Sequence, residues 1–221
     1  MDNNSILISV IKEAVSPLAT LLAAFFGAWF AYRFQDRVKA RDVISANISA
    51  ANKAMFKVFQ LLNSLALFQK DVIDPCRGRP DICFTMLPML PDDHSDYRFD
   101  FQGLGFILDS KHKKIMLDLF IEEQRYREAI KAINARSMLH KGFVQPALVS
   151  AGFKEDSAYP VELFAQALGP LLFKDIQNLT NQVIYHVDRT VKSLEETKNN
   201  MHAAFKEMFP EGNFLNIELV K

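Results

Sequence analysis

The chain has 221 residues, and its 26 lysine and arginine side chains balance 26 aspartate and glutamate side chains. This balance argues against a polybasic nucleic-acid-binding protein and against a disordered acidic tail, because each needs an excess of one charge. Hydrophobic residues make up 49% of the chain and only 8 residues are glycine, which is typical of a helical globular domain with an apolar core.

Residues 1–15 place apolar side chains on one helical face, and two arrangements are open for this amphipathic segment. It can lie as a separate helix in the outer interface of a membrane. Alternatively, helix runs unbroken from Ser5, with Lys12 and Glu13 paired or facing the interior of a bundle. Ser16 and Pro17 are typical of the N-cap and first position of a following helix.

Residues 16–35 are predicted to form a single transmembrane helix. No charged side chain occurs between Ala14 and Tyr32, and about 19 helical residues cover the roughly 30 Å of a bilayer core. A cleaved signal peptide is disfavoured, because the preceding segment is long and weakly basic and no A-x-A-like site follows the apolar run. The positive residues that flank the span on its C-terminal side place residues 36–221 in the cytoplasm; they are Arg33, Arg37, Lys39 and Arg41.

Small residues recur every four positions along this span, at Ala19, Ala23, Gly27 and Ala31. Small residues four apart let two helix backbones approach closely in lipid, and this packing drives association. We therefore expect contact with membrane lipid and a homo-oligomer that forms through this small-residue stripe.

Residues 36–221 are predicted to form one cytoplasmic helical bundle. Helical periodicity covers residues 36–74, then 110–140, and then a helix that Pro160 opens and Gly169-Pro170 kinks. Long helices joined by short turns favour antiparallel packing. The predicted fold class is all-α: one N-terminal transmembrane helix that continues into a cytoplasmic antiparallel bundle with an irregular insertion.

The irregular insertion covers residues 75–109, where four prolines exclude a long helix. We expect it to cap the end of the bundle farthest from the membrane, with one short strand around Phe99. Cys76, Cys83 and His94 lie in it among several aspartates, but their spacing matches no usual zinc pattern, so no metal is expected. The thiols are expected to be reduced in the cytoplasm.

No Ser-His-Asp, Cys-His or paired-carboxylate arrangement is supported by spacing, so neither catalysis nor a cofactor nor a small-molecule substrate is expected. An enzyme with a site in residues 75–109 is the least favoured alternative. His186 lies on the predicted seam of the last helix, where a hydrogen-bonded core histidine is favoured over one that titrates and switches packing.

Basic side chains at two places are candidates for contact with a partner such as a nucleoprotein. Aspartates in the same region nearly cancel their field, so a solvated face of mixed charge is the favoured interpretation. The candidate residues are Arg77, Arg79, Lys111, Lys113 and Lys114.

Four short motifs and His140 resemble a group of small bacterial membrane proteins with one N-terminal anchor and a cytoplasmic helical domain. The motifs are FILDS at 106–110, EQRY at 123–126, AINARS at 132–137 and VQP at 144–146. Some of those proteins resemble the transmembrane effectors that accompany retron reverse transcriptases in anti-phage systems. The resemblance implies a toxic protein that a reverse transcriptase–nucleic acid complex holds silent and that infection releases. It assigns no functional residue.

The resulting hypothesis is a membrane-anchored effector of a bacterial anti-phage defence system. It would oligomerise in the inner membrane and permeabilise it after release from a cytoplasmic partner. The alternative is a non-toxic tether or scaffold whose helical domain binds a cytoplasmic partner.

Overall fold

The computed structural model describes the backbone of residues 3–89, 98–154 and 159–216, and the side chains of these ranges from residue 19 onward. Within these residues every regular element is a helix and no strand occurs, which confirms the all-α fold class. The chain divides into two compact units, Met1–Asn47 (unit 1) and Ile48–Lys221 (unit 2).

Unit 1 consists of the first part of helix α1, which spans Asn3–Phe68. The backbone is helical through Ser16 and Pro17, so the predicted helix start at Ser16 is wrong and the unbroken alternative agrees with the backbone. The side chains of residues 1–18, including the apolar face of the amphipathic segment, lie outside the described part. Every side chain from 19 to 46 is exposed. The predicted boundary between residues 35 and 36 falls within this unit.

In unit 2, helix α1 buries one face. It continues into a π-helical turn at Gln69–Ile73 (η1) and a 3-10 turn at Asp74–Cys76 (η2), as the periodicity of residues 36–74 indicates. Pro75 lies in η2 and ends the run, because proline lacks the backbone donor that a continuing helix needs. The buried seam residues follow one another at intervals of three and four; they are Ala51, Met55, Val58, Leu62 and Leu65.

Helix α3 spans Lys114–Leu139 and continues through a π-helical segment at His140–Val144 (η4) into α4 at Gln145–Ser150. Helix α5 spans Val161–Met208 and bends at Gly169, whose φ of 71° and ψ of 165° are not helical. Only glycine adopts this φ without a steric cost, and Pro170 restarts the helix where a backbone donor is dispensable. The predicted kink is therefore confirmed.

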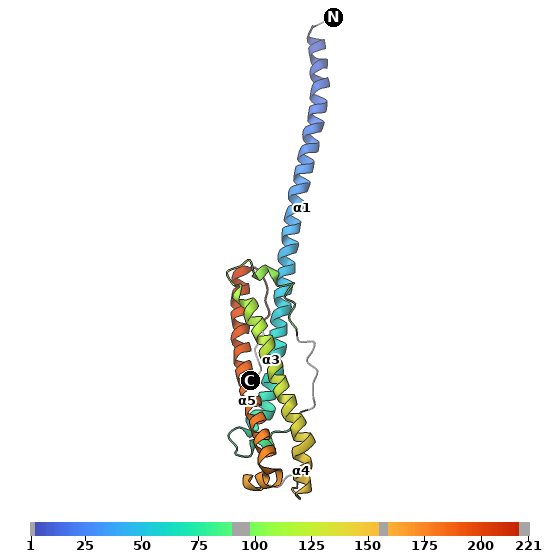
Figure 1. The fold of residues 1–221 in the computed structure, drawn as a ribbon. Helices are drawn as coiled ribbons and strands as arrows, with labels where there is room; N and C mark the ends of the chain where they lie inside the picture. Colours follow the sequence, from blue (N-terminus) through green and yellow to red (C-terminus); the bar gives the residue numbers. More distant parts are fainter. Residues whose placement is uncertain (1–2, 90–97, 155–158, 217–221) are drawn as a thin grey trace. The chain divides into compact units, whose positions relative to one another are not determined.

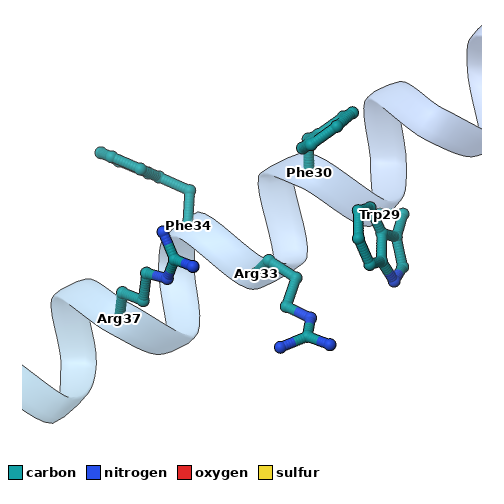
Figure 2. A pocket seen from close by; sticks show the side chains of 5 residues that line it. All are labelled: Trp29, Phe30, Arg33, Phe34 and Arg37. Carbon is teal, nitrogen blue, oxygen red and sulfur yellow. The ribbon is translucent and has the colours of Figure 1, made fainter.

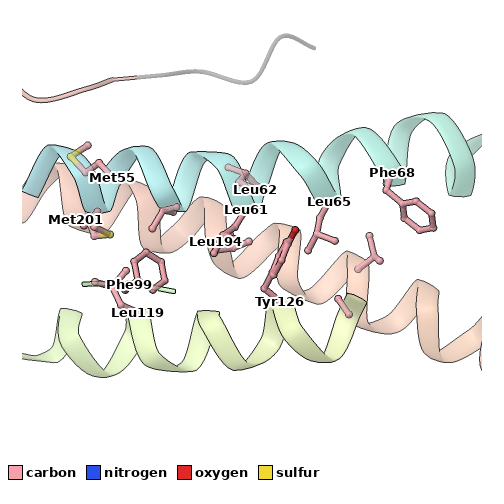
Figure 3. Packing of buried hydrophobic residues seen from close by; sticks show 14 of the residues in the cluster. Met55, Leu61, Leu62, Leu65, Phe68, Phe99, Leu119, Tyr126, Leu194 and Met201 are labelled. Atoms are coloured by element: carbon pink, nitrogen blue, oxygen red, sulfur yellow. The ribbon is translucent and has the colours of Figure 1, made fainter. Parts of the chain in front are cut away.

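Helix α5 runs antiparallel to α1 within unit 2. Asn52 near the start of this part of α1 donates a 2.9 Å hydrogen bond to the carbonyl of Asn213, beyond the end of α5. Gln69 at the other end donates a 2.7 Å bond to Asp188 in the middle of α5. Figure 3 shows the same order, with the α1 residues rising and the α5 residues falling in number along the bundle.

Helix α3 also runs antiparallel to α5 and therefore runs parallel to α1. Ser193 of α5 donates a 2.7 Å hydrogen bond to Glu122 near the start of α3, and Arg136 near its end donates a 3.2 Å bond to Thr180. The prediction of antiparallel packing is thus wrong for the α1–α3 pair. Figure 1 shows α3 and α5 beside the lower part of α1 in unit 2.

The insertion explains this parallel pair, because it carries the chain back along the bundle. Its described parts contain the end of η2, a short helix α2 at Ile82–Thr85 and a 3-10 turn η3 at Gly105–Ile107. The carbonyl of Cys83 contacts Arg136 near the end of α3, whereas Leu104 lines a hollow with Ala50 at the start of unit 2. The insertion therefore does not cap one end of the bundle. Phe99 is not in a strand, and residues 90–97, with His94, lie outside the described part.

The core of unit 2 lies between α1, α3 and α5, as Figure 3 shows. Burying one such Leu or Phe side chain stabilises the fold by about 1.5–3 kcal/mol, so these contacts outweigh any single surface ion pair. The largest side chains that are almost fully buried there include Leu61, Leu62, Leu65, Leu119, Leu194 and Phe205.

Candidate functional site

Large apolar side chains project outward from α1 in unit 1. Leu21 is 68% exposed, Phe25 65%, Phe30 63% and Phe34 71%. The helix satisfies its own backbone hydrogen bonds, but these apolar side chains still lack apolar surroundings. Contiguous exposed apolar surface of this kind marks a contact with a membrane or with another protein.

In the described part of the chain, no helix carries a stretch that is both long and apolar enough to cross a membrane. The predicted span begins at residue 16, and the side chains of residues 16–18 lie outside that part. The transmembrane helix therefore stays a prediction.

The small-residue stripe is exposed on α1. Ala19, Ala23, Gly27 and Ala31 are all exposed, and a methyl group added at Gly27 would meet nothing within 4 Å.

The flanking arginines lie among aromatic rings. Trp29, Phe30, Arg33, Phe34 and Arg37 line one hollow on the surface of α1, and Figure 2 shows them on successive turns of the helix. The guanidinium of Arg33 lies 5.3 Å from the centre of the Trp29 ring, a cation–π distance. We call these five residues the aromatic–arginine hollow. The other flanking cations, Lys39 and Arg41, are exposed on the same helix.

The five candidate partner-contact cations do not form one surface. Arg77 lies beside α5 and forms two 2.9 Å hydrogen bonds with Asp188. Lys111 pairs with Glu207, which lies 19 residues farther along α5. This separation amounts to about 28 Å along a helix. The idea that these cations meet a partner together is therefore not supported by their placement.

Internal ion pairs also occupy most of these cations. The carboxylate of Asp188 raises the pKa of Arg77 above its ordinary value. Burial opposes the charge of Asp188, but hydrogen bonds from Arg77 and Gln69 outweigh burial and lower the pKa of its carboxyl group. Arg79 pairs with Asp81 at 2.9 Å. The remaining two candidates are Lys113 and Lys114, which are exposed at the start of α3.

Sequence analysis missed a buried cation, Arg136, which is 2% exposed. Its guanidinium donates to Thr180 and to backbone carbonyls of the insertion, at 3.2 Å for Cys83 and 3.5 Å for Leu87, with a further bond to Met86. Burial lowers its pKa to about 10, so it remains a cation at neutral pH. The residue holds the insertion against α3 and α5.

The burial of Arg136 has a signal in the sequence. Ala129, Ile133, Arg136 and His140 follow one another at intervals of four, three and four, which is the spacing of the buried face of α3. When helical spacing places a charged residue on the same face as core residues, we expect that residue to be buried and fully hydrogen-bonded.

His140 follows Arg136 on this face and is also buried. Its Nδ1 has no hydrogen-bond partner among the described residues. Burial, and then the nearby charge of Arg136, lowers its pKa to about 4, although a hydrogen bond to the backbone of Phe84 opposes this change. The imidazole is therefore neutral at physiological pH.

We expect unit 2 to lose stability as the pH falls from about 6.5 to about 4. Over this range the unfolded chain binds a proton at His140 that the folded chain does not bind, so acid favours unfolding. Urea unfolding of the full chain in detergent at several pH values measures this loss, which His140→Gln should reduce. His202→Gln, at a half-buried histidine of α5, is the control; an equal effect of the two variants would contradict the prediction.

A groove between α3 and α5 carries two further exposed aromatic side chains. Phe120 is 51% exposed and Tyr185 55%, and both line a hollow of about 310 Å³ with Arg125, Arg189 and other residues. His186 is half-buried at this groove, not in the core, so its predicted role as a core histidine is wrong.

Chemistry-bearing clusters are sparse in the described residues. No group of three or more histidine, cysteine, aspartate or glutamate side chains there has the arrangement of a metal site. Cys76 and Cys83 are buried free thiols, and burial raises the pKa of Cys83 to about 11, which keeps it protonated. Comparison of the chain with family models, curated proteins and solved structures found no match.

Proposed function

We propose that the protein is a membrane-anchored effector of the retron-associated anti-phage type that acts at the bacterial inner membrane. One observation carries the membrane part of this proposal: exposed apolar side chains extend from Leu21 to Phe34 and lead directly into the cations Arg33 to Arg41. Each large apolar side chain that moves from water to lipid gains about 1.5–3 kcal/mol, so exposure of the whole surface to water is unfavourable.

The small-residue stripe supports the next step, association of several copies in the bilayer. The open space beside Gly27 admits the backbone of a second helix, and van der Waals packing between close helices is the main attraction in lipid. Anchors that associate in this way would permeabilise the membrane. The resemblance to retron-associated effectors supports this last step.

Unit 2 is the proposed sensor of a cytoplasmic partner. It has its own core and presents the groove that Phe120, Tyr185 and Arg189 line. In this proposal a reverse transcriptase–nucleic acid complex binds unit 2 and keeps the protein silent, and loss of this complex during infection releases it.

Expression of the full chain without any partner tests the effector proposal. An effector should slow growth and collapse the membrane potential soon after induction, as a potential-sensitive dye reports. The groove between α3 and α5 also suits the alternative, a tether that only binds a partner. If the protein is present in the membrane but growth and membrane potential stay normal, the tether is favoured and the effector is contradicted.

Topology provides a separate prediction. A reporter that works only in the cytoplasm should be active when fused after Lys221 and inactive when fused before Met1, because positively charged flanks stay in the cytoplasm. Paired fusions to a periplasmic reporter give the matched control. The opposite pattern would contradict the assignment of unit 2 to the cytoplasm.

A further inference from the structure

The aromatic–arginine hollow is a feature that a simple anchor does not require. It has a volume of about 470 Å³ and is lined only by residues of α1, as Figure 2 shows. Trp29 is 43% exposed, Phe30 63% and Phe34 71%. Their rings thus offer apolar surface to a ligand instead of packing inside the protein.

The cations of the hollow are available to an anion. Among the described residues, no carboxylate pairs with Arg33 or Arg37, although Asp36 directly precedes Arg37 in the sequence. The two arginines are four positions apart, so they lie on one helix face about one turn, or roughly 5–6 Å, from each other. Guanidinium groups bind phosphate oxygens in a bidentate manner, and two long arginine side chains on neighbouring turns can reach one phosphate.

The arrangement of rings and cations selects one kind of ligand. The rings of Trp29 and Phe30 lie on the side of the predicted span, whereas Arg37 lies on the side of the cationic flank. A ligand that fills the hollow must therefore combine an acyl or other apolar part with an anionic head. Trp and Arg side chains at the end of a membrane-spanning stretch occupy the headgroup layer of a bilayer, where such molecules are abundant.

We propose that the aromatic–arginine hollow binds the phosphate headgroup of an anionic phospholipid. Arg33 and Arg37 hold the phosphate, and Trp29, Phe30 and Phe34 contact the glycerol and the upper acyl chains. The inference rests on the proposed membrane location and adds a lipid class and a site. Arg33, which lies over Trp29, therefore acts at this specific site in addition to its contribution to the positive charge of the flank.

The chain contains its own reporter of this site, because Trp29 is its only tryptophan. The full chain is reconstituted into phosphatidylcholine vesicles that contain about 20 mol % phosphatidylglycerol, which resembles an anionic leaflet. In one sample the phosphatidylglycerol carries brominated acyl chains. In the other sample the phosphatidylglycerol is unlabelled, and an equal amount of the phosphatidylcholine carries brominated acyl chains. Bromine quenches tryptophan fluorescence at short range, so the ratio of quenching measures enrichment of anionic lipid beside Trp29.

We expect the anionic brominated lipid to quench Trp29 roughly twofold more than the neutral one, because arginine side chains near the surface attract anionic lipid. Arg33→Gln with Arg37→Gln should bring the ratio to about one. The matched control, Lys39→Gln with Arg41→Gln, removes the same charge outside the hollow and should leave most of the preference. A ratio of one in the parent, or equal loss in both double variants, would overturn the site.

Two further outcomes separate this inference from its premises. If phosphate buffer abolishes the preference of Trp29 for anionic lipid and a chloride buffer of equal ionic strength does not, the site binds free phosphate. This result would overturn the lipid assignment. Absence of quenching by either brominated lipid would overturn the membrane location itself, and the lipid site with it. Quenching by both lipids without a preference would leave the anchor intact and overturn only the site.

Discussion

Replacing Arg136 with alanine is expected to lower the free energy of unfolding of unit 2 by about 2–5 kcal/mol, which is the range for truncation of a large buried side chain to alanine. The guanidinium is the hydrogen-bond donor to the carbonyls of Cys83, Met86 and Leu87, and its removal leaves these groups with a buried void beside them. Lysine at this position keeps the charge but cannot reproduce the planar fork of donors, so its effect should be large as well.

Arg127→Ala is the matched control on the same helix. Arg127 is exposed and pairs with Glu123 at 2.8 Å, so its loss should cost less than about 1 kcal/mol. Urea unfolding of the full chain in detergent compares the two variants, and hydrogen exchange at residues 82–89 shows whether the insertion detaches first. Equal stability of the two variants would contradict the assigned role of Arg136.

The features that sequence predicted well depend on local physics. The buried face of α5 follows in most positions from apolar and threonine residues at intervals of three and four; Val183, Thr190, Leu194 and Met201 are buried, whereas His186 is half-buried. The kink at Gly169 follows from the backbone of Gly-Pro itself. Each of these signals lies within a few residues of the structure that it predicts.

The features that sequence analysis missed depend on where distant segments meet. The parallel direction of α3 arises because residues 75–109 return along the bundle, and their irregular sequence has no periodicity that reveals this path. Short connections make antiparallel neighbours, but a long one also permits parallel neighbours. The separation of Arg77 from Lys111 and the carbonyl partners of Arg136 follow from the same path.

More of the candidate site than of the interior of unit 2 could be predicted from the sequence. The flanking cations and the stripe from Ala19 to Ala31 need only the geometry of a single helix, and the structure places them on one exposed helix as expected. The contact between Arg33 and Trp29 also follows from a spacing of four. The lipid and the second copy that we propose to cover this surface are not part of the chain, so its sequence does not identify them.

Replacing Gly27 with leucine tests this surface as an interface between copies of the chain. The structure has nothing within 4 Å of the added side-chain position, and leucine favours helix over glycine by about 0.8–1 kcal/mol, so the fold of one copy should not suffer. Insertion should persist, because leucine also favours the bilayer by a few tenths of a kcal/mol. Association should weaken by about 1 kcal/mol or more, because the helix backbones can no longer approach closely.

Leu22→Ile is the control, because Leu22 is 51% exposed on another side of α1 and the exchange conserves volume. Crosslinking in membranes measures the oligomer, and growth and membrane potential after induction measure toxicity, all at matched membrane levels. Gly27→Leu should lose crosslinked oligomer and toxicity together, whereas Leu22→Ile should retain both. A Gly27→Leu protein that inserts normally and is as oligomeric and as toxic as the parent would exclude the small-residue stripe as the interface. Because permeabilisation in this proposal requires that interface, the proposed mechanism would fail with it.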